Sequence, residues 1–325
     1  MLVESKPSAN YRRRIAAILA GVVLIFATVP EVRAQNLKAR KAPANPAAVH
    51  DCGNGVALRL TSSKAPEGGL LEVTVTSTSP LGEIKGDMAG HLIPFWADGD
   101  RTRHGLVGID LERAPGKYDL NVSVSGGEGG QQMTCSVAVN VEPGHFAVES
   151  LKVAPGFVEL SPEDQARADR EREHTHQIFA TITPEPLWDG KFRMPLYGNR
   201  TGHNFGKRRV LNGKAESPHT GLDISAPAGT LIHATQRGRV ALAENLFYSG
   251  NTVILDHGLG IYTFYGHMKS ISVSEGQMVV AGTVLGHVGA TGRATGPHLH
   301  WSLVIDGARV NPLGIVRLGS LVAAR

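Results

Sequence analysis

The sequence has few of the residues on which helical bundles and nucleic-acid-binding proteins depend. Aromatic residues make up only 6% of the 325 positions and charged residues 19%, whereas glycine occurs 39 times. Many glycines with few aromatic residues favour strands and tight turns over a bundle of helices. The formal net charge is +4, and residues 1–34 account for +3 of it. The remaining chain is close to neutral, so charge offers no argument for nucleic acid as a partner.

Long hydrophobic runs are also scarce. The longest uncharged run extends from Ile15 to Pro30, follows three arginines that begin at Arg12, and precedes the small-residue pattern that ends at Ala34. Its 16 residues fall short of the roughly 20 that a membrane-spanning helix needs. We therefore interpret residues 1–34 as a secretory signal peptide cleaved after Ala34. The alternative is an uncleaved signal, which would be the only membrane attachment.

Export implies a location in the periplasm or cell envelope, or secretion from the cell.

Cysteine is nearly absent, with Cys52 and Cys135 as the only two. In an oxidising compartment such a pair indicates a disulfide. Two free thiols are the alternative. No cluster of cysteine or histidine lies beside either residue, which argues against a zinc site built on them.

The expected chain is mainly β, and its length suits about two domains. Residues 35–50 are rich in alanine, proline and lysine and indicate a spacer. Residues 51–149 contain short alternating strands, such as 70–76, 118–124 and 135–141, separated by glycine, proline and serine. This pattern predicts an immunoglobulin-like β-sandwich that serves as an accessory domain. Its polar segment with His91 and His104 lacks metal-ligand spacing, and we expect a solvated loop.

Residues 150–190 are expected to link the two domains. Ser161 is followed by a proline and two acidic residues, the usual start of a helix. The charged sequence that follows predicts a short, solvated linker helix to about Ala180. We expect a second domain over residues 191–325.

The residues that suggest chemistry lie in this second domain. Residues 251–257 and 261–267 flank Gly258-Leu259-Gly260, which predicts a hairpin. His298 and His300 are two residues apart before an apolar run, so on a strand they face the same side. His219 and Asp223 flank Gly221, which favours a turn that leads into a strand. If these strands meet, His219, Asp223 and His300 would provide three nitrogen and oxygen ligands and leave a fourth position open, as in catalytic zinc sites.

Six motifs in register from about Phe192 to Pro312 resemble the lysostaphin-type (LytM-like) zinc peptidases that cut peptidoglycan cross-links. The motifs are Ser217-Pro218-His219-Thr220-Gly221-Leu222-Asp223, Ala226-Pro227-Ala228-Gly229-Thr230, Gly250-Asn251-Thr252-Val253, Tyr265-Gly266-His267, Gly289-Ala290-Thr291-Gly292 and Thr295-Gly296-Pro297-His298-Leu299-His300-Trp301.

The resemblance implies an antiparallel β metallopeptidase domain (a duplicated hybrid motif) with one zinc ion held by His219, Asp223 and His300. It also implies catalytic roles for His267 and His298, without deciding which is the general base, and a peptidoglycan peptide as substrate. The expected function is that of an exported zinc metalloendopeptidase.

Two other functions fit parts of the sequence. Residues 272–286 resemble half of a biotinyl or lipoyl carrier domain, with Lys269 as the modified residue, but such carriers work inside cells. Some relatives of the LytM-like peptidases are inactive cell-wall-binding proteins that activate an amidase. Those proteins typically lack metal ligands, whereas all five functional positions are present here. The sequence does not indicate the peptide bond that is cut, autoinhibition by the linker, or the oligomeric state.

Overall fold

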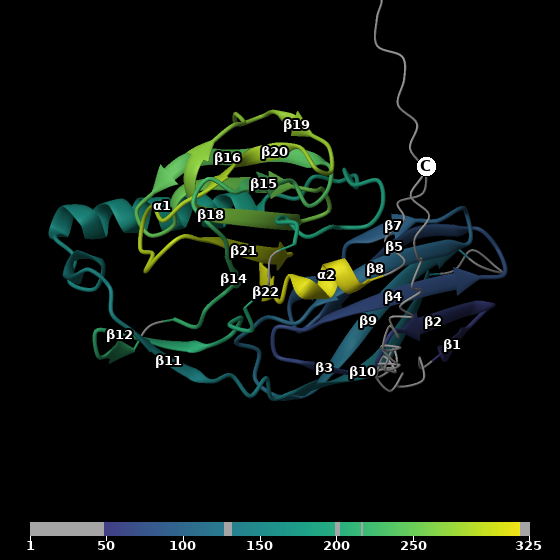
Figure 1. Cartoon of the computed structure of the whole chain (residues 1–325). Coiled ribbons are helices and arrows are strands. Elements are labelled where there is room, and N and C mark those ends of the chain that lie inside the picture. Colours follow the sequence, from purple (N-terminus) through teal and green to yellow (C-terminus); the bar gives the residue numbers. More distant parts are fainter. Residues whose placement is uncertain (1–48, 127–131, 199–201, 216, 319–325) are drawn as a thin grey trace, which may run out of the picture. The chain divides into compact units, whose positions relative to one another are not determined.

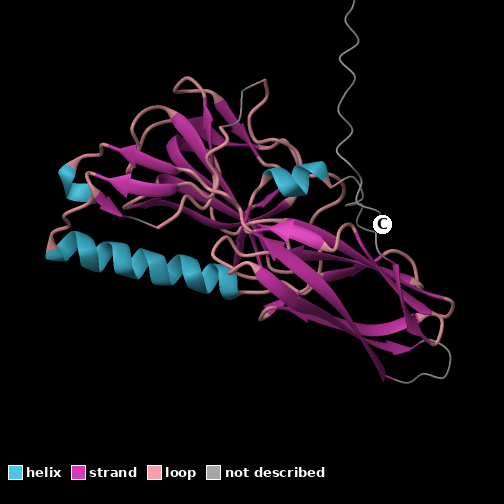
Figure 2. Cartoon of the chain, turned by 90° about the horizontal axis from the view of Figure 1, so that it is seen from below, coloured by secondary structure: helices cyan, strands magenta, loops and turns pink. Residues whose placement is uncertain are grey.

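The computed structural model describes residues 49–126, 132–198, 202–215 and 217–318 (Figure 1). Strands predominate among them, which confirms the prediction of a mainly β protein (Figure 2). The signal peptide expected over 1–34, and nearly all of the expected spacer, lie outside the described residues. No helix within the described ranges has the length and hydrophobicity to cross a bilayer.

Two five-stranded sheets make up the first half of the described chain. In spatial order, the first contains β1 (Val49–Gly53), β2 (Val56–Leu60), β4 (Leu70–Ser77), β8 (Thr102–Gly108) and β7 (Phe95–Ala97). The second contains β3 (Lys64–Pro66), β10 (Gln132–Glu142), β9 (Gly116–Gly126), β5 (Leu81–Met88) and β6 (His91–Leu92).

The two sheets share one apolar core, to which Leu58 and Val73 contribute from the first sheet and Val122 and Val139 from the second. A disulfide between Cys52 on β1 and Cys135 on β10 links the sheets. The strands predicted over 70–76, 118–124 and 135–141 fall within β4, β9 and β10. The assignment to the immunoglobulin type stays a prediction.

His104 does not lie in the solvated loop that we expected. It is part of β8, where its Nδ1 is 3.4 Å from Glu72 Oε1 and its Nε2 is 3.4 Å from Asp98 Oδ2. The hydrogen bond to Glu72 raises the pKa of His104, although burial opposes this effect. The polar sequence of 98–104 did not indicate that a strand begins at Thr102, because the contacts of His104 with Glu72 and Asp98 are not evident from the sequence.

The second half of the described chain forms a nine-stranded antiparallel sheet and a small three-stranded one. The large sheet contains β14 (Leu222–Ser225), β15 (Leu231–His233), β16 (Gly238–Leu246), β17 (Gly250–Asp256), β18 (Ile261–Ile271), β19 (Met278–Val279), β20 (Val284–Val288), β21 (His298–Ile305) and β22 (Ala308–Val310). The small sheet contains β11 (Val148–Leu151), β12 (Arg208–Leu211) and β13 (Lys214–Ala215). The predicted hairpin is confirmed as β17 and β18.

The predicted linker helix is α1 (Pro162–Ala180), which begins as expected with the Ser161 side chain accepting a hydrogen bond from Asp164 N at 3.1 Å. A one-turn 3₁₀ helix, η1 (Pro155–Phe157), precedes it, and α2 (Leu313–Arg317) follows the last strand. The boundary predicted between residues 149 and 150 falls inside β11, and the domain limits stay predictions.

The two halves are joined by an apolar cluster and by ion pairs. Trp96 from β7 and Leu106 from β8 pack in one cluster with Trp188 and with Leu303 from β21. Arg309 on β22 donates to both carboxylate oxygens of Asp110, with Nη2–Oδ1 at 2.7 Å and Nε–Oδ2 at 3.0 Å. The sandwich is therefore part of one compact unit with the large sheet.

Replacing Arg309 should test this connection. Burial alone would raise the pKa of Asp110, but the hydrogen bonds from Arg309 lower it to about 2, from an ordinary value of 3.8. Asp110 therefore stabilises the fold above pH 3.8, and this contribution is lost as the pH falls toward 2. We expect Arg309→Ala to lower the free energy of unfolding by about 2 kcal/mol at pH 7, and the difference from wild type to shrink below pH 4.

Denaturant unfolding of both proteins across this pH range would measure the effect. Lys214→Ala is the control, since it breaks an exposed ion pair with Glu159 and should cost less than about 0.5 kcal/mol. A loss for Arg309→Ala as small as that of the control would show that the ion pair does not hold the two halves together.

Candidate metal centre

Asp223 and His300 lie directly opposite each other on neighbouring strands. β14 pairs with β21 in an antiparallel register that matches Asp223 with His300 and Ser225 with His298. Leu222 and Ile224, like Leu299 and Trp301, point into the core, so the polar residues between them emerge on the other face. The alternation of apolar and polar residues thus places Asp223, His298 and His300 on one side of the sheet.

His219 reaches the same place from the turn before β14. Its backbone is fixed by hydrogen bonds from His219 N to Lys207 O at 2.9 Å and from Gly206 N to His219 O at 2.8 Å. Gly221 is needed in this turn because a Cβ there would lie 2.3 Å from Ser302 Oγ and 2.7 Å from the Trp301 carbonyl oxygen. Any side chain at this position would push the turn away from β21.

Three ligating atoms meet at this point: His219 Nε2, Asp223 Oδ1 and His300 Nδ1. His219 Nε2 is 2.9 Å from His300 Nδ1, and both nitrogens are 3.0 Å from Asp223 Oδ1. Nδ1 of His219 donates to the Asn204 carbonyl oxygen at 2.9 Å, which leaves a lone pair on Nε2 of the neutral ring. Two imidazole nitrogens and a carboxylate oxygen are a ligand set that zinc uses in proteins. The residues present therefore fit a zinc ion.

The charge state of the cluster also suits a cation. Burial alone would raise the pKa of Asp223, but the neighbouring imidazoles of His219 and His300 lower it well below its usual range. Burial lowers the pKa of His300 to about 4, although its hydrogen bond to Asp223 opposes the shift. At neutral pH the site thus combines an ionised carboxylate with a neutral His300.

A second group of residues holds the ligands in place. Asn204 Nδ2 donates to Asp223 Oδ2 at 2.9 Å, its Oδ1 accepts from Asp223 N at 3.0 Å, and its carbonyl oxygen accepts from His219. Arg209 Nη2 also donates to Asp223 Oδ2, at 2.7 Å. Oδ2 is therefore occupied by protein donors, and Oδ1 faces the two histidines. His300 Nε2 lies 2.8 Å from Ser302 Oγ, which fixes the orientation of the ring.

The two histidines expected to be catalytic lie beside the ligands. His298 Nε2 is 3.6 Å from Asp223 Oδ1, and the ring centroids of His267 and His298 are 4.7 Å apart. Each ring donates from Nδ1 to a backbone carbonyl, His267 to Thr291 and His298 to Gly296, both at 2.8 Å. The neutral rings therefore carry their lone pairs on Nε2. Burial, with the nearby His300 and His298, lowers the pKa of His267 to about 3.

We predicted a strand that ends at His267, but the observed strand is longer. β18 continues to Ile271, and a register shift against β17 between Val253 and Asn251 leaves an extra residue in β18 around His267. His267 adopts a φ of +60°, and its N–H donates to the Ser249 carbonyl oxygen. The bulge interrupts the alternation of the strand and sets the direction of this side chain.

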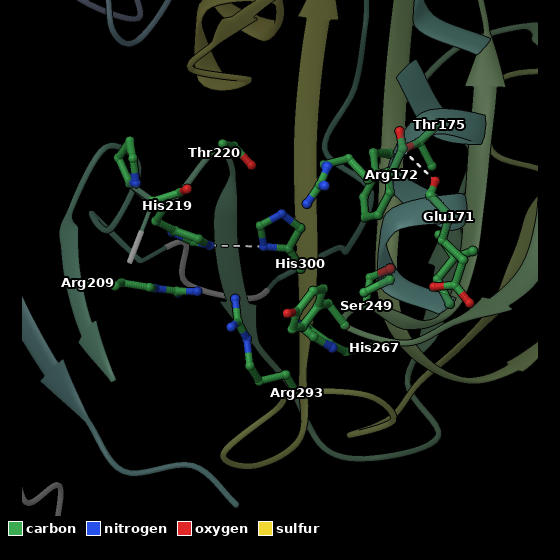
Figure 3. A pocket seen from close by; sticks show the side chains of 16 residues that line it. Glu171, Arg172, Thr175, Arg209, His219, Thr220, Ser249, His267, Arg293 and His300 are labelled. Carbon is green, nitrogen blue, oxygen red and sulfur yellow. Dashed lines mark hydrogen bonds between the residues drawn. The ribbon is translucent and has the colours of Figure 1, made fainter. Parts of the chain in front are cut away.

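A pocket of about 350 Å³ opens beside the ligands (Figure 3). His219, His267 and His300 line it, together with Ala168, Glu171, Arg172 and Thr175 of α1. The predicted linker helix α1 is largely exposed to solvent, with Ala168 as its one buried residue among those described, and one of its faces also forms a wall of the pocket.

The sequence predicted the five candidate histidine and aspartate positions but did not indicate the contacts that Asn204, Arg209 and Ser302 make with them. The only signal for Asn204 was its place beside His203 and Phe205 ahead of the first ligand, and Arg209 was one basic residue among several. Asn204 and Arg209 act through hydrogen bonds that join β14 to β12 and to the segment before β12. The spacing of residues along the sequence does not specify such hydrogen bonds.

Residues 217–312 match peptidase family M23. The matched segment includes His219, Asp223, His267, His298 and His300. The match agrees with the resemblance to lysostaphin-type peptidases that the motifs indicated.

The chain is also similar to two curated bacterial proteins. It is 40% identical over 115 residues to the peptidoglycan DD-endopeptidase ShyA of Vibrio cholerae, which covers 35% of this chain and 27% of the relative. It is 39% identical over 121 residues to the DD-carboxypeptidase/endopeptidase Mpg of Neisseria meningitidis, which covers 37% of this chain and 28% of that relative. The chain thus spans less than a third of the length of these relatives.

A solved structure matches more of the chain. The crystal structure of a Pseudomonas aeruginosa protein described as a candidate M23 peptidase aligns with a TM-score of 0.60 and 29% identity, over 78% of this chain and 95% of that one. This likeness extends well beyond residues 217–312 and therefore includes part of the chain outside the segment that matches family M23.

Removing the Asn204 side chain should weaken metal binding without removing a ligand. In Asn204→Ala the carboxylate of Asp223 loses one hydrogen-bond donor and the backbone N–H of Asp223 loses its acceptor, and we expect a 10- to 100-fold lower affinity for zinc. Competition against a chromogenic chelator would measure this affinity. His203→Ala, which alters the exposed neighbouring side chain, is the control and should bind zinc like wild type. Equal affinities for Asn204→Ala and wild type would mean that Asn204 does not position the ligands.

Proposed function

We propose that this protein is a zinc-dependent endopeptidase that hydrolyses peptide bonds in peptidoglycan cross-links. The observation that carries the proposal is the meeting of His219 Nε2, Asp223 Oδ1 and His300 Nδ1 beside a pocket that His219 and His300 line, within the segment that matches family M23. Zinc held by these three residues would supply Lewis-acid chemistry, which polarises the scissile carbonyl group and makes a water molecule more acidic.

His267 and His298 supply the proton transfers in this proposal. Their Nδ1–H groups are anchored on backbone carbonyls, so each neutral ring has an Nε2 lone pair that can accept a proton from the attacking water. Once protonated, the same nitrogen can donate a hydrogen bond to the oxyanion that develops on the substrate or return the proton to the leaving amine. Their fixed orientation beside the ligands lowers the entropic cost of both steps.

The relatives and the N-terminal sequence support the proposed substrate and location. The relatives ShyA and Mpg are named for endopeptidase activity, and the former for peptidoglycan. Peptidoglycan lies outside the cytoplasmic membrane, which agrees with our interpretation of residues 1–34 as an export signal. We accordingly place the mature protein in the periplasm or cell envelope. We also propose that the sandwich over residues 51–149 serves as an accessory domain.

The alternative is an inactive cell-wall-binding protein that activates an amidase. Two observations argue against it: no metal ligand is missing, and the residues that hold the ligands, Asn204 and Arg209, are hydrogen-bonded to Asp223. An inactive binding protein has no need for such an arrangement.

Alanine variants should separate metal binding from catalysis. We expect His219→Ala and Asp223→Ala to lose zinc, since each removes one of three ligands. His267→Ala and His298→Ala should keep one zinc per chain but lose 10²- to 10⁴-fold in turnover of purified sacculi, the usual contribution of a general acid or base. Elemental analysis and release of soluble muropeptides would measure the two properties.

His287→Ala is the control, since His287 lies on β20 in the same domain and contacts Ser270 rather than the ligands. It should retain both zinc and activity. Wild-type turnover in either His267→Ala or His298→Ala would remove that residue from the mechanism. Failure of the zinc-loaded wild-type protein to digest sacculi would favour the amidase activator.

A further inference from the structure

His267 has a backbone conformation that few residues other than glycine adopt. Its φ is +60°, in the left-handed region, and only 8% of the residue is exposed. A residue with a side chain is strained in this region and stays there only where the surrounding contacts hold it. The bulge of β18 that presents His267 therefore needs support. The Ser249 carbonyl oxygen, which accepts from His267 N at 2.6 Å, provides one part of this support.

The side chain of Thr291 provides another part. Asn251 N donates to Thr291 Oγ1 at 2.9 Å, and the same hydroxyl group donates to the Met268 carbonyl oxygen at 2.8 Å. Asn251 on β17 and Met268 on β18 are the two residues that the register pairs beside the bulge. The hydroxyl group therefore bridges the two strands at the residue that follows His267, with its proton and one lone pair both in use.

The loop that carries Thr291 approaches these strands closely. Gly250, at the start of β17, has a φ of +62°, and a Cβ there would lie 2.2 Å from Thr291 Oγ1 and 2.4 Å from the Thr291 carbonyl carbon. Glycine at this position thus leaves the space that the threonine occupies. Arg293 N, two residues further on, donates to the Tyr248 carbonyl oxygen at 2.7 Å. The loop is therefore attached through its backbone as well as through the threonine hydroxyl.

The carbonyl group of Thr291 contacts the histidine ring itself. It accepts a hydrogen bond from His267 Nδ1 at 2.8 Å. Because a carbonyl oxygen can only accept, this contact selects the ring tautomer that has a proton on Nδ1 and a lone pair on Nε2. The carbonyl and the hydroxyl belong to one residue, so the bridge between the strands also fixes the place of the carbonyl.

We propose that Thr291 is a positioning residue for His267. Its hydroxyl group holds the bulge of β18, and its carbonyl group keeps the lone pair of the ring on Nε2, where a proton can be accepted. The effect on turnover rests on the proposed peptidase function, whereas the effect on the ring tautomer does not. His298 is held differently, since its Nδ1 donates to the Gly296 carbonyl oxygen within its own segment. Thr291 should therefore act on one of the two histidines.

Thr291→Val tests the bridge, because valine has the shape of threonine without the hydroxyl group. For the zinc-loaded variant we expect kcat on purified cross-linked muropeptide dimers to fall at least about tenfold, since a misplaced base loses its alignment with the reacting atoms. KM should stay within about twofold of wild type, because an interaction that acts only in the transition state is lost. The zinc content should not change. Thr291→Ser keeps the hydroxyl group and should recover most of the lost kcat.

Nuclear magnetic resonance of the histidine ring nitrogens tests the same proposal without a substrate. A protonated ring nitrogen and one that carries a lone pair have well-separated chemical shifts. At neutral pH, zinc-loaded wild type and Thr291→Ser should show His267 protonated on Nδ1 alone, and Thr291→Val should show a mixture of both tautomers. His298 should keep its proton on Nδ1 in all three proteins.

Thr283→Val is the matched control. Thr283 Oγ1 also accepts from a backbone N–H of the same half of the chain, that of Val280 at 3.1 Å, in the turn between β19 and β20. This variant should keep the kcat and the ring tautomers of wild type. If Thr291→Val does not fold, Thr291→Ala, which also lacks the hydroxyl group, is compared with Thr291→Ser in its place, and the same differences are expected.

Wild-type kcat in Thr291→Val, or a lower kcat with the tautomer of His267 unchanged, would overturn the positioning role. An equal loss of kcat in Thr291→Ser would also overturn it, because the hydroxyl group would then not be the support. Failure of the wild-type protein to cleave the dimers would overturn the proposed function, and the ring tautomers would still decide the role of Thr291.

Discussion

The antiparallel pairing of β14 with β21 is the constraint on which the site depends. It sets Asp223 opposite His300 and brings His298 into the same face, while Leu222, Ile224, Leu299 and Trp301 fill the core beneath them. A shift of one residue in this register would turn the ligands into the core and the apolar residues toward the pocket. The apolar residues therefore determine where Asp223, His298 and His300 lie. Burial of the core stabilises the one register in which the ligands meet.

Hydrogen bonds from outside the sheet then refine this arrangement. Asn204 contacts both His219 and Asp223, and Arg209 holds the outer oxygen of the same carboxylate. The bulge in β18 provides the other side of the site, because it releases His267 from the alternation of the strand. The site is thus formed by three kinds of local structure. The strand pair positions Asp223 and His300, the turn before β14 positions His219, and the bulge positions His267. The sandwich is connected to the same sheet through the cluster of Trp96 and Leu303 and through Arg309.

Much of this arrangement could be predicted from the sequence. The parts that could not be predicted have one physical reason in common. Alternating residues around Asp223 and His300 indicated strands, and the family-like motifs ordered His219, His267 and His298 around them. The capping residues of α1 predicted where that helix begins. Each of these signals is local in sequence. The role of Asn204, the partners of His104 and the direction of the α1 face depend on contacts between segments far apart in the chain, which composition and periodicity do not specify.

The most direct test of the account is X-ray diffraction from crystals of the zinc-loaded protein, recorded on both sides of the zinc absorption edge. We expect one strong anomalous peak per chain, about 2.0–2.2 Å from His219 Nε2, Asp223 Oδ1 and His300 Nδ1. A peak bound elsewhere in the chain, with these three atoms unliganded, would contradict it.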